Sequence, residues 1–204
     1  MSPSFALPLF PLRTVLFPDG MLALKIFEAR YLDLVSACLR EERPFGVVCL
    51  AEGGEVRAEQ EALRLEAVGT LAHLESVDSD QPGILHIRCR GGERFRIEGT
   101  PQTDSGGLWT AEARLFDEQA PTPIPEGGEA VVRALAQAID ALQAQGERRV
   151  LLPLHFDDAG WVADRWCELL PITLSARQKL LELEDAALRL KLIGDFLRHK
   201  KVIG

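Results

Sequence analysis

Arginines recur at alternate positions on both sides of a diglycine, and this spacing is the strongest sign of chemistry in the chain. The residues are Arg88, Arg90, Arg94 and Arg96. Alternate side chains of a strand lie on one face, and guanidinium groups donate paired hydrogen bonds to carboxylates and phosphates. The pattern therefore predicts a candidate anion-binding face. The competing interpretation is a solvated face neutralised by acidic residues on adjoining strands, such as Glu66, Glu75 and Glu98.

The diglycine at 91–92 predicts a β-hairpin between the two arginine pairs. A two-residue loop would place Arg88 opposite Phe95 and would mix the polar and apolar faces. A loop of three residues instead pairs Cys89 with Phe95, and we expect this loop because the buried face sets the register. The same register places Arg88 opposite Arg96, and such a like-charge pair costs up to roughly 1 kcal/mol.

Histidine and aspartate offer two further groupings. His73 and His86 lie on predicted strands and would be neighbours if those strands pair. A metal pair would need further ligands that the sequence does not place, so exposed strand positions are the better interpretation. His155 is followed by aspartates that resemble a catalytic cluster: Asp157, Asp158 and Asp164. Helix capping explains these aspartates, and we predict no catalytic residue, no metal site and no cofactor.

The four cysteines are predicted to be reduced and buried. None lies in a C-x-x-C pair, and three of them sit within apolar patterns, as small hydrophobic residues do. They are Cys38, Cys49, Cys89 and Cys167. A disulfide framework or a zinc site is not expected from this spacing.

Length and charge limit the class of protein. The chain has 204 residues and a net charge of −8, and residues 1–118 carry 12 Lys and Arg against 19 Asp and Glu, a balance of −7. A field of this sign opposes non-specific binding to a polyanion. No apolar stretch approaches the ~18 residues of a membrane span, and the N-terminus has no signal-peptide pattern. We expect a cytoplasmic protein without membrane contact.

A segment rich in proline and glycine divides the chain. Pro121, Pro123 and Pro125 alternate and are followed by a diglycine, a composition that favours extended chain over helix or sheet. We therefore expect an α+β protein with a β domain over residues 1–118, a linker over 119–128 and a helical bundle over 129–204.

Strands alternate with turns in the first part of the chain. Strands are predicted at 45–50 and 66–77, and at 109–115, where apolar residues alternate. Turns are predicted at 52–54 and at Pro18-Asp19-Gly20, where positive φ is expected at the glycine. One helix begins near Glu28, and its predicted buried face has helical spacing: Tyr31, Leu32, Val35, Cys38 and Leu39.

Amphipathic helices follow the linker. The first carries an apolar stripe over residues 131–142 and ends at Gly146. Capping residues predict where the others begin. The predicted starts are Asp157 or Asp158 for the second helix, Ser175 with Gln178 as a capping box for the third, and about Asp185 for the fourth.

Motifs near the start of the chain carry a family resemblance: Leu7-Pro8-Leu9-Phe10-Pro11-Leu12, residues 15–20, and Ile26-Phe27-Glu28-Ala29-Arg30-Tyr31. They resemble the opening of the Lon N-terminal, substrate-binding domain family. Later stretches in the family's order support the resemblance: 68–72 with 94–97, and 161–164 leading to 170–172. The chain departs from the family at Ala29, where proline is usual, but the high helix propensity of alanine should preserve the helix start. The resemblance implies a PUA-like β pseudobarrel with one inserted helix, followed by a helical bundle.

The resemblance also implies a function. We expect a non-enzymatic module that binds unfolded polypeptide or a specific protein partner, with no small-molecule substrate. Full Lon proteases add an ATPase domain and a Ser-Lys protease domain. This sequence has no G-x-x-x-x-G-K-[ST] loop, and no G-x-S-x-G or H-E-x-x-H motif.

Polypeptide is expected to bind by apolar contact in a groove between the β domain and the helices, with pairing on an edge strand as a further mode. Exposed apolar side chains would mark such a surface. For Arg30, a structural role at the helix start is the stronger interpretation. The candidate polypeptide-binding residues are Phe17, Met21, Phe27, Arg30, Tyr31 and Trp161.

The alternative function is nucleic-acid binding by a PUA-like protein through the arginine face. The −7 balance of residues 1–118 and the scarcity of aromatic residues suited to base stacking argue against it. A hydrolase in a cleft between the domains ranks last.

Overall fold

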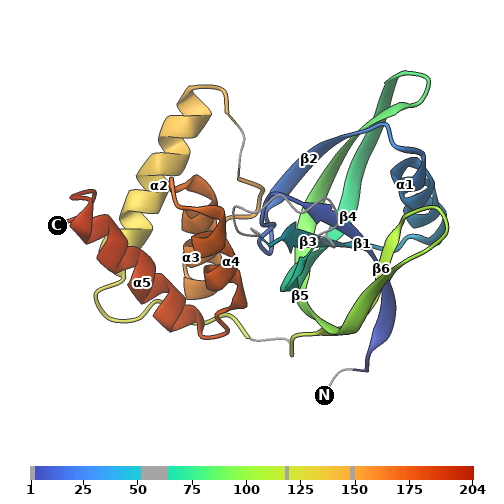
Figure 1. Cartoon of the computed structure of the whole chain (residues 1–204). Helices are drawn as coiled ribbons and strands as arrows, with labels where there is room; N and C mark the ends of the chain where they lie inside the picture. Colours follow the sequence, from blue (N-terminus) through green and yellow to red (C-terminus); the bar gives the residue numbers. More distant parts are fainter. Residues whose placement is uncertain (1–2, 52–63, 118–119, 148–149) are drawn as a thin grey trace, which may run out of the picture. The chain divides into compact units, whose positions relative to one another are not determined.

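The computed structural model describes residues 3–51, 64–117, 120–147 and 150–204. The chain forms two compact units, Met1–Asp117 and Glu118–Gly204, the first built mainly of strands and the second of helices (Figure 1). The predicted α+β class is confirmed. The turn predicted at 52–54 lies outside the described residues. Among the described helices, none is long and apolar enough to cross a membrane.

The first unit is one curled sheet with an inserted helix. Its elements are β1 (Phe5–Leu12), β2 (Met21–Ile26), α1 (Ala29–Glu41), β3 (Phe45–Leu50), β4 (Leu65–Gln81), β5 (Ile84–Thr103) and β6 (Trp109–Leu115). The strand order is β2-β5-β4-β3-β1-β6, and a further pairing of β5 with β6 closes a ring. β1 and β3 are parallel, and the other pairs are antiparallel. β2 lies outside the ring and pairs with the first half of β5.

The hairpin predicted at the diglycine is wrong, because β5 continues through it as one strand of 20 residues. The chain before β2 lies against this point: Gly91 N–H donates to Gly20 O, and Asp19 N–H donates to Gly91 O, both at 2.8 Å. A Cβ at Gly91 would lie 2.1 Å from Phe17 O. The register with β4 also shifts just before Ala72. The glycines therefore let the backbone of residues 17–20 approach β5 closely and let the strand bend, instead of reversing the direction of the chain.

The turn before β2 has its left-handed residue one position earlier than predicted. Gly20 N–H donates to Phe17 O at 2.9 Å and closes the turn. Positive φ falls at Asp19, at 56°, and not at Gly20. Aspartate visits this conformation more readily than most residues that carry a side chain. The turn predicted from proline and glycine is therefore present, with aspartate in the strained position.

α1 packs one face into the core of the first unit. The buried residues are Tyr31, Leu34, Val35 and Cys38. The predicted face omitted Leu34 and included Leu39, which is 51% exposed. Phe10 of β1 stacks on Tyr31 with ring centroids 3.9 Å apart. This contact with the sheet sets which side of α1 is buried, and helical spacing alone does not specify it.

The described part of the second unit contains four helices: α2 (Glu129–Ala144), α3 (Ala159–Leu169), α4 (Leu174–Glu182) and α5 (Ala186–His199). Two predicted caps are confirmed, because Asp158 and Asp185 accept main-chain N–H bonds at 2.9 and 3.0 Å. α4 begins earlier than predicted, since Thr173 caps it and Ser175 lies in its first turn. Gly146, with φ of +79°, follows the end of α2.

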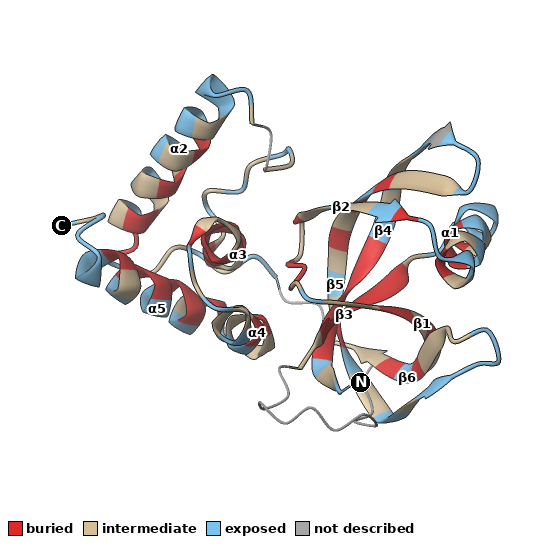
Figure 2. Ribbon diagram, turned by 45° about the horizontal axis from the view of Figure 1, so that its top comes forward, coloured by how far each residue is buried: buried red, intermediate tan, exposed pale blue. Residues whose placement is uncertain are grey.

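One buried arginine connects three of these helices. α3 packs against α2, α4 and α5, and its side chains are buried along most of its length (Figure 2). Arg189 of α5 lies 3.2 Å from Asp164 of α3. Its Nη1 also donates to Leu183 O, directly after α4, at 2.7 Å. The buried charges of Arg189 and Asp164 are thus partners of each other, as an interior of low polarity requires.

Burial changes the ionisation of several groups. All four cysteines are buried and unlinked, and burial raises the pKa of Cys89 to about 12, so this thiol stays protonated at neutral pH. Burial also raises the pKa of Glu168 from 4.5 to about 8. The guanidinium of Arg165, 3.0 Å away, opposes this effect on the pKa without cancelling it.

Replacing Gly91 should destabilise the first unit strongly. G91A places a methyl group against Phe17 O, and overpacking of this kind costs about 1–3 kcal/mol. Urea denaturation measures the loss. G106A is the matched control, because the nearest atom to its Cβ is the Asp104 side chain at 3.3 Å, and we expect a change below about 0.5 kcal/mol. Equal stability of the two variants would contradict the close approach at Gly91.

The free energy of unfolding should fall as the pH rises from about 4.5 to about 8. Glu168 binds its proton more tightly when folded, since its pKa is raised. Its contribution is complete below the unfolded-state pKa and is lost as the pH rises through the folded-state value. E168Q cannot ionise and should remove this part of the slope in urea denaturation between pH 5 and pH 9. D140N, at an exposed position of α2, should keep the wild-type slope. An unchanged slope in E168Q would refute the role of Glu168.

Candidate functional site

β2 is an edge strand of the first unit. Within the part of the chain that the structure describes, it pairs with β5 alone, and Figure 1 shows it along the margin of the sheet. Leu22 lies opposite Cys89, Leu24 opposite Ile87 and Ile26 opposite Leu85. An open strand edge offers unpaired main-chain N–H and C=O groups to a second chain.

Apolar side chains are concentrated along this edge. Met21, Leu22 and Leu24 are half-buried, and Phe27, directly after the strand, is 66% exposed. Phe27 is the only aromatic residue among the large hydrophobic side chains that are exposed in the described residues. We name Met21, Leu22, Leu24 and Phe27 the β2 surface. Apolar groups that gather at an open edge are typical of a binding surface.

The start of α1 fixes the chain beside Phe27. Arg30 donates from Nε and Nη2 to Glu28 Oε2, at 3.0 and 2.7 Å, and from Nη1 to Gly107 O at 2.8 Å. Its guanidinium also lies 4.7 Å from the centre of the Tyr31 ring. All these contacts are internal, so they support the structural interpretation of Arg30. They attach the first turn of α1 to the loop between β5 and β6.

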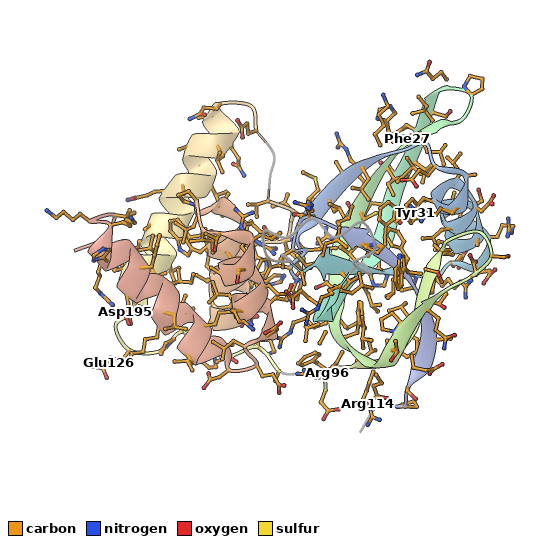
Figure 3. All side chains as sticks on the ribbon, viewed as in Figure 1. Phe27, Tyr31, Arg96, Arg114, Glu126 and Asp195 are labelled. Carbon is orange, nitrogen blue, oxygen red and sulfur yellow. The ribbon has the colours of Figure 1, made fainter. Side chains whose placement is uncertain are left out.

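Half of the predicted polypeptide-binding residues are buried. Phe17 is 0% exposed, Tyr31 6% and Trp161 4%. Burial raises the pKa of the Tyr31 hydroxyl, and Trp161 packs at right angles to Phe156 in the second unit. These three side chains belong to the cores. The accessible ones are Met21 on β2, Phe27 directly after it (Figure 3) and Arg30 in the first turn of α1.

The predicted anion-binding arginines do not gather at one point, because β5 bends between the two pairs. Arg90 donates to Glu75 at 2.8 Å and to Asp19 at 3.3 Å. These hydrogen bonds, first of all that with Glu75, raise the pKa of the Arg90 guanidinium. Arg88 is exposed and lies opposite Ser76 and Ala23. Arg88 and Arg90 thus lie beside β2, and carboxylates neutralise Arg90.

The second arginine pair lies in the other half of β5. Arg94 and Arg96 lie over the ring of Phe116, at 4.7 and 5.2 Å from its centre. Arg96 is opposite Arg114 in the sheet (Figure 3), and Arg114 pairs with Glu98 at 2.7 Å. The predicted opposition of Arg88 and Arg96 does not occur.

The histidine and aspartate groupings are also separated. His73 lies opposite Arg90, whereas His86 lies opposite Asp78. Asp158 caps α3, and Asp164 pairs with Arg189. The described residues include no group of three or more side chains placed to bind a metal ion.

A hollow of about 420 Å³ lies in the second unit between the start of α2 and α5. Val131, Leu188 and Leu190 contribute apolar surface to it. Glu126 and Asp195 also line it (Figure 3), and Asp195 pairs with Arg198 at 2.7 Å. Because charges of both signs surround this hollow, it does not select one class of ligand.

Comparison with known proteins identifies relatives along nearly the whole chain. The family profile of the ATP-dependent protease La (LON) substrate-binding domain matches residues 6–199. Lon protease 2 of Herpetosiphon aurantiacus is 26% identical over 199 residues, and Lon protease of Paraburkholderia phytofirmans is 28% identical over 198. Each match covers 95% of this chain but 24% of the relative. The chain therefore spans about a quarter of these curated relatives.

Solved structures agree with this comparison. A Lon N-terminal domain protein from Xanthomonas campestris is 30% identical with a TM-score of 0.75, over 93% of this chain and 96% of that one. The N-terminal domain of Mycobacterium avium complex Lon protease has a TM-score of 0.60 over 94% and 97% of the two chains. At 17% identity, this second likeness shows the fold alone. The resemblance predicted from the sequence is confirmed, and the chain belongs to the LON substrate-binding domain family.

Proposed function

We propose that this chain is a non-catalytic module that binds polypeptide and that the β2 surface contacts apolar segments of its partner. Membership of a substrate-binding domain family supports the general role. The observation that supports this location is the exposure of Phe27, whose side chain is 66% exposed at the end of an open edge strand. Unfolded chains present such apolar segments, whereas folded proteins bury most of theirs.

Contact with Phe27 gives a useful but moderate gain in affinity. Complete burial of a phenylalanine side chain contributes about 1.5–3 kcal/mol. Half-buried Met21, Leu22 and Leu24 contribute less each, because part of their surface is already removed from water. Binding costs translational and rotational freedom, so the expected result is reversible, weak binding. A module that samples many polypeptides needs such rapid release.

Nucleic-acid binding is the less favoured function. Arg90 and Arg114 pair with carboxylates, and residues 1–118 carry a net charge of −7. A phosphate backbone would have to displace these internal partners and approach a negatively charged unit.

Replacing Phe27 should weaken binding of an apolar peptide about tenfold, because tenfold corresponds to about 1.4 kcal/mol and the buried ring contributes about that much or more. Fluorescence anisotropy with a labelled, unstructured apolar peptide measures the dissociation constants of the wild type and F27S. L39S is the matched control, since Leu39 is 51% exposed on α1, outside the β2 surface. It should bind like the wild type. Equal weakening by both substitutions would place the binding site elsewhere.

A further inference from the structure

We infer that the β2 surface takes an extended peptide as an added strand on the open edge of β2, and that it prefers peptides in which apolar and acidic residues alternate. This inference rests on the proposed function and specifies the chemistry of the partner. Three observations carry it: the direction of the main-chain groups on β2, the apolar side chains on one face, and the cationic side chains on the other.

The hydrogen-bonding phase of β2 determines which main-chain groups are free. Gly91 N–H donates to Gly20 O at 2.8 Å, and the register that pairs Met21 with Arg90 places Gly20 opposite Gly91. Opposite residues of antiparallel strands alternate between hydrogen-bonded and non-hydrogen-bonded pairs. Leu22, Leu24 and Ile26 therefore bond to β5. The main-chain groups of Met21, Ala23 and Lys25 point to the open side, where an added strand would find them.

One face of this edge is apolar. Leu22 and Leu24 pack against the core that includes Ile87 and Cys89 of β5, and the same face continues on β4 through Leu74 and Val77. An added strand would place every second side chain beside Leu22 and Leu24. Apolar residues at these alternate positions of the peptide would extend the apolar face.

The opposite face of the edge begins with Met21 and carries two exposed cations, and exposed Asp78 lies across His86 from Lys25. Lys25 is exposed on β2, and exposed Arg88 lies on β5 opposite the small side chain of Ala23. Within the described residues, neither Lys25 nor Arg88 takes part in an ion pair. Arg90, in contrast, is neutralised by Glu75 and Asp19. The remaining side chains of an added strand would face Lys25 and Arg88, and acidic residues complement them.

These charges also select against pairing of one copy with another. Two β2 edges would bring a second Lys25 and a second Arg88 to the same face, and like charges on neighbouring strands are unfavourable. A lysine on an edge strand commonly prevents such self-pairing. The occupant that fits is therefore an acidic–apolar peptide and not a second copy of the chain.

Three labelled decapeptides test the side-chain preference by fluorescence anisotropy. The first alternates leucine with glutamate, the second replaces each glutamate by lysine, and the third has the first peptide's composition in separate apolar and acidic blocks. We expect the first to bind at least about tenfold more tightly than the other two. K25E should reduce this preference for glutamate over lysine. Equal affinities for all three peptides would overturn the inference.

Two changes to the main chain test strand pairing. A23P removes an N–H that points to the open side, and proline is tolerated in an edge strand at such a position. It should weaken binding about tenfold while the thermal midpoint of unfolding changes little. N-methylation of the first peptide at alternate residues removes peptide donors from one side of the added strand. Methylation of one set of alternate residues should abolish binding, and methylation of the other set should not. This second test uses the wild-type protein, so it does not depend on the folding of a variant.

The outcomes separate this inference from the proposed function. If the alternating peptide binds and F27S weakens it, but A23P and both methylated peptides bind within about twofold of their references, strand addition is refuted and the proposed function stands. If neither the alternating peptide nor an unstructured apolar peptide binds the wild type at high micromolar concentration, the proposed function itself fails.

Discussion

The first unit depends on the contact between the backbone of residues 17–20 and the bend of β5. Two main-chain hydrogen bonds join Gly91 to Asp19 and Gly20, and the space for them exists only because residue 91 has no Cβ. This contact fixes where β2 begins and therefore its register on β5. It also lets β5 pair with β2 in its first half and with β6 in its second, in addition to β4. The open edge of β2 is a direct result.

The class of the fold and most element positions could be predicted from the sequence because they follow local rules. Apolar patterns located β3, β4 and β6, and aspartates marked the starts of α3 and α5. The diglycine misled the prediction, since the same two residues permit either a reversal or a close approach. Only the distant residues 17–20 decide between these outcomes. The buried face of α1 was partly misassigned for a similar reason, because a stacking contact with Phe10 orients it.

The candidate site was predictable only in part. Met21 and Phe27 were among the six candidate polypeptide-binding residues, and Phe27 is indeed exposed. Phe17, Tyr31 and Trp161 looked equivalent in the sequence, but tertiary packing buries them. Leu22 and Leu24 were missed, because their accessibility depends on β2 having one neighbour in the sheet. Sequence patterns distinguish apolar from polar faces but do not show which strand is left at the edge.

The side chain of Arg189 has a consequence for how the second unit unfolds. It contacts the carboxylate of α3 and a carbonyl directly after α4 while belonging to α5. α4 has only nine residues, too few for a stable helix in isolation. Because one guanidinium contacts all three segments, detachment of any one of them removes a partner from a buried charge. We therefore expect these three short helices to unfold together, as one cooperative unit.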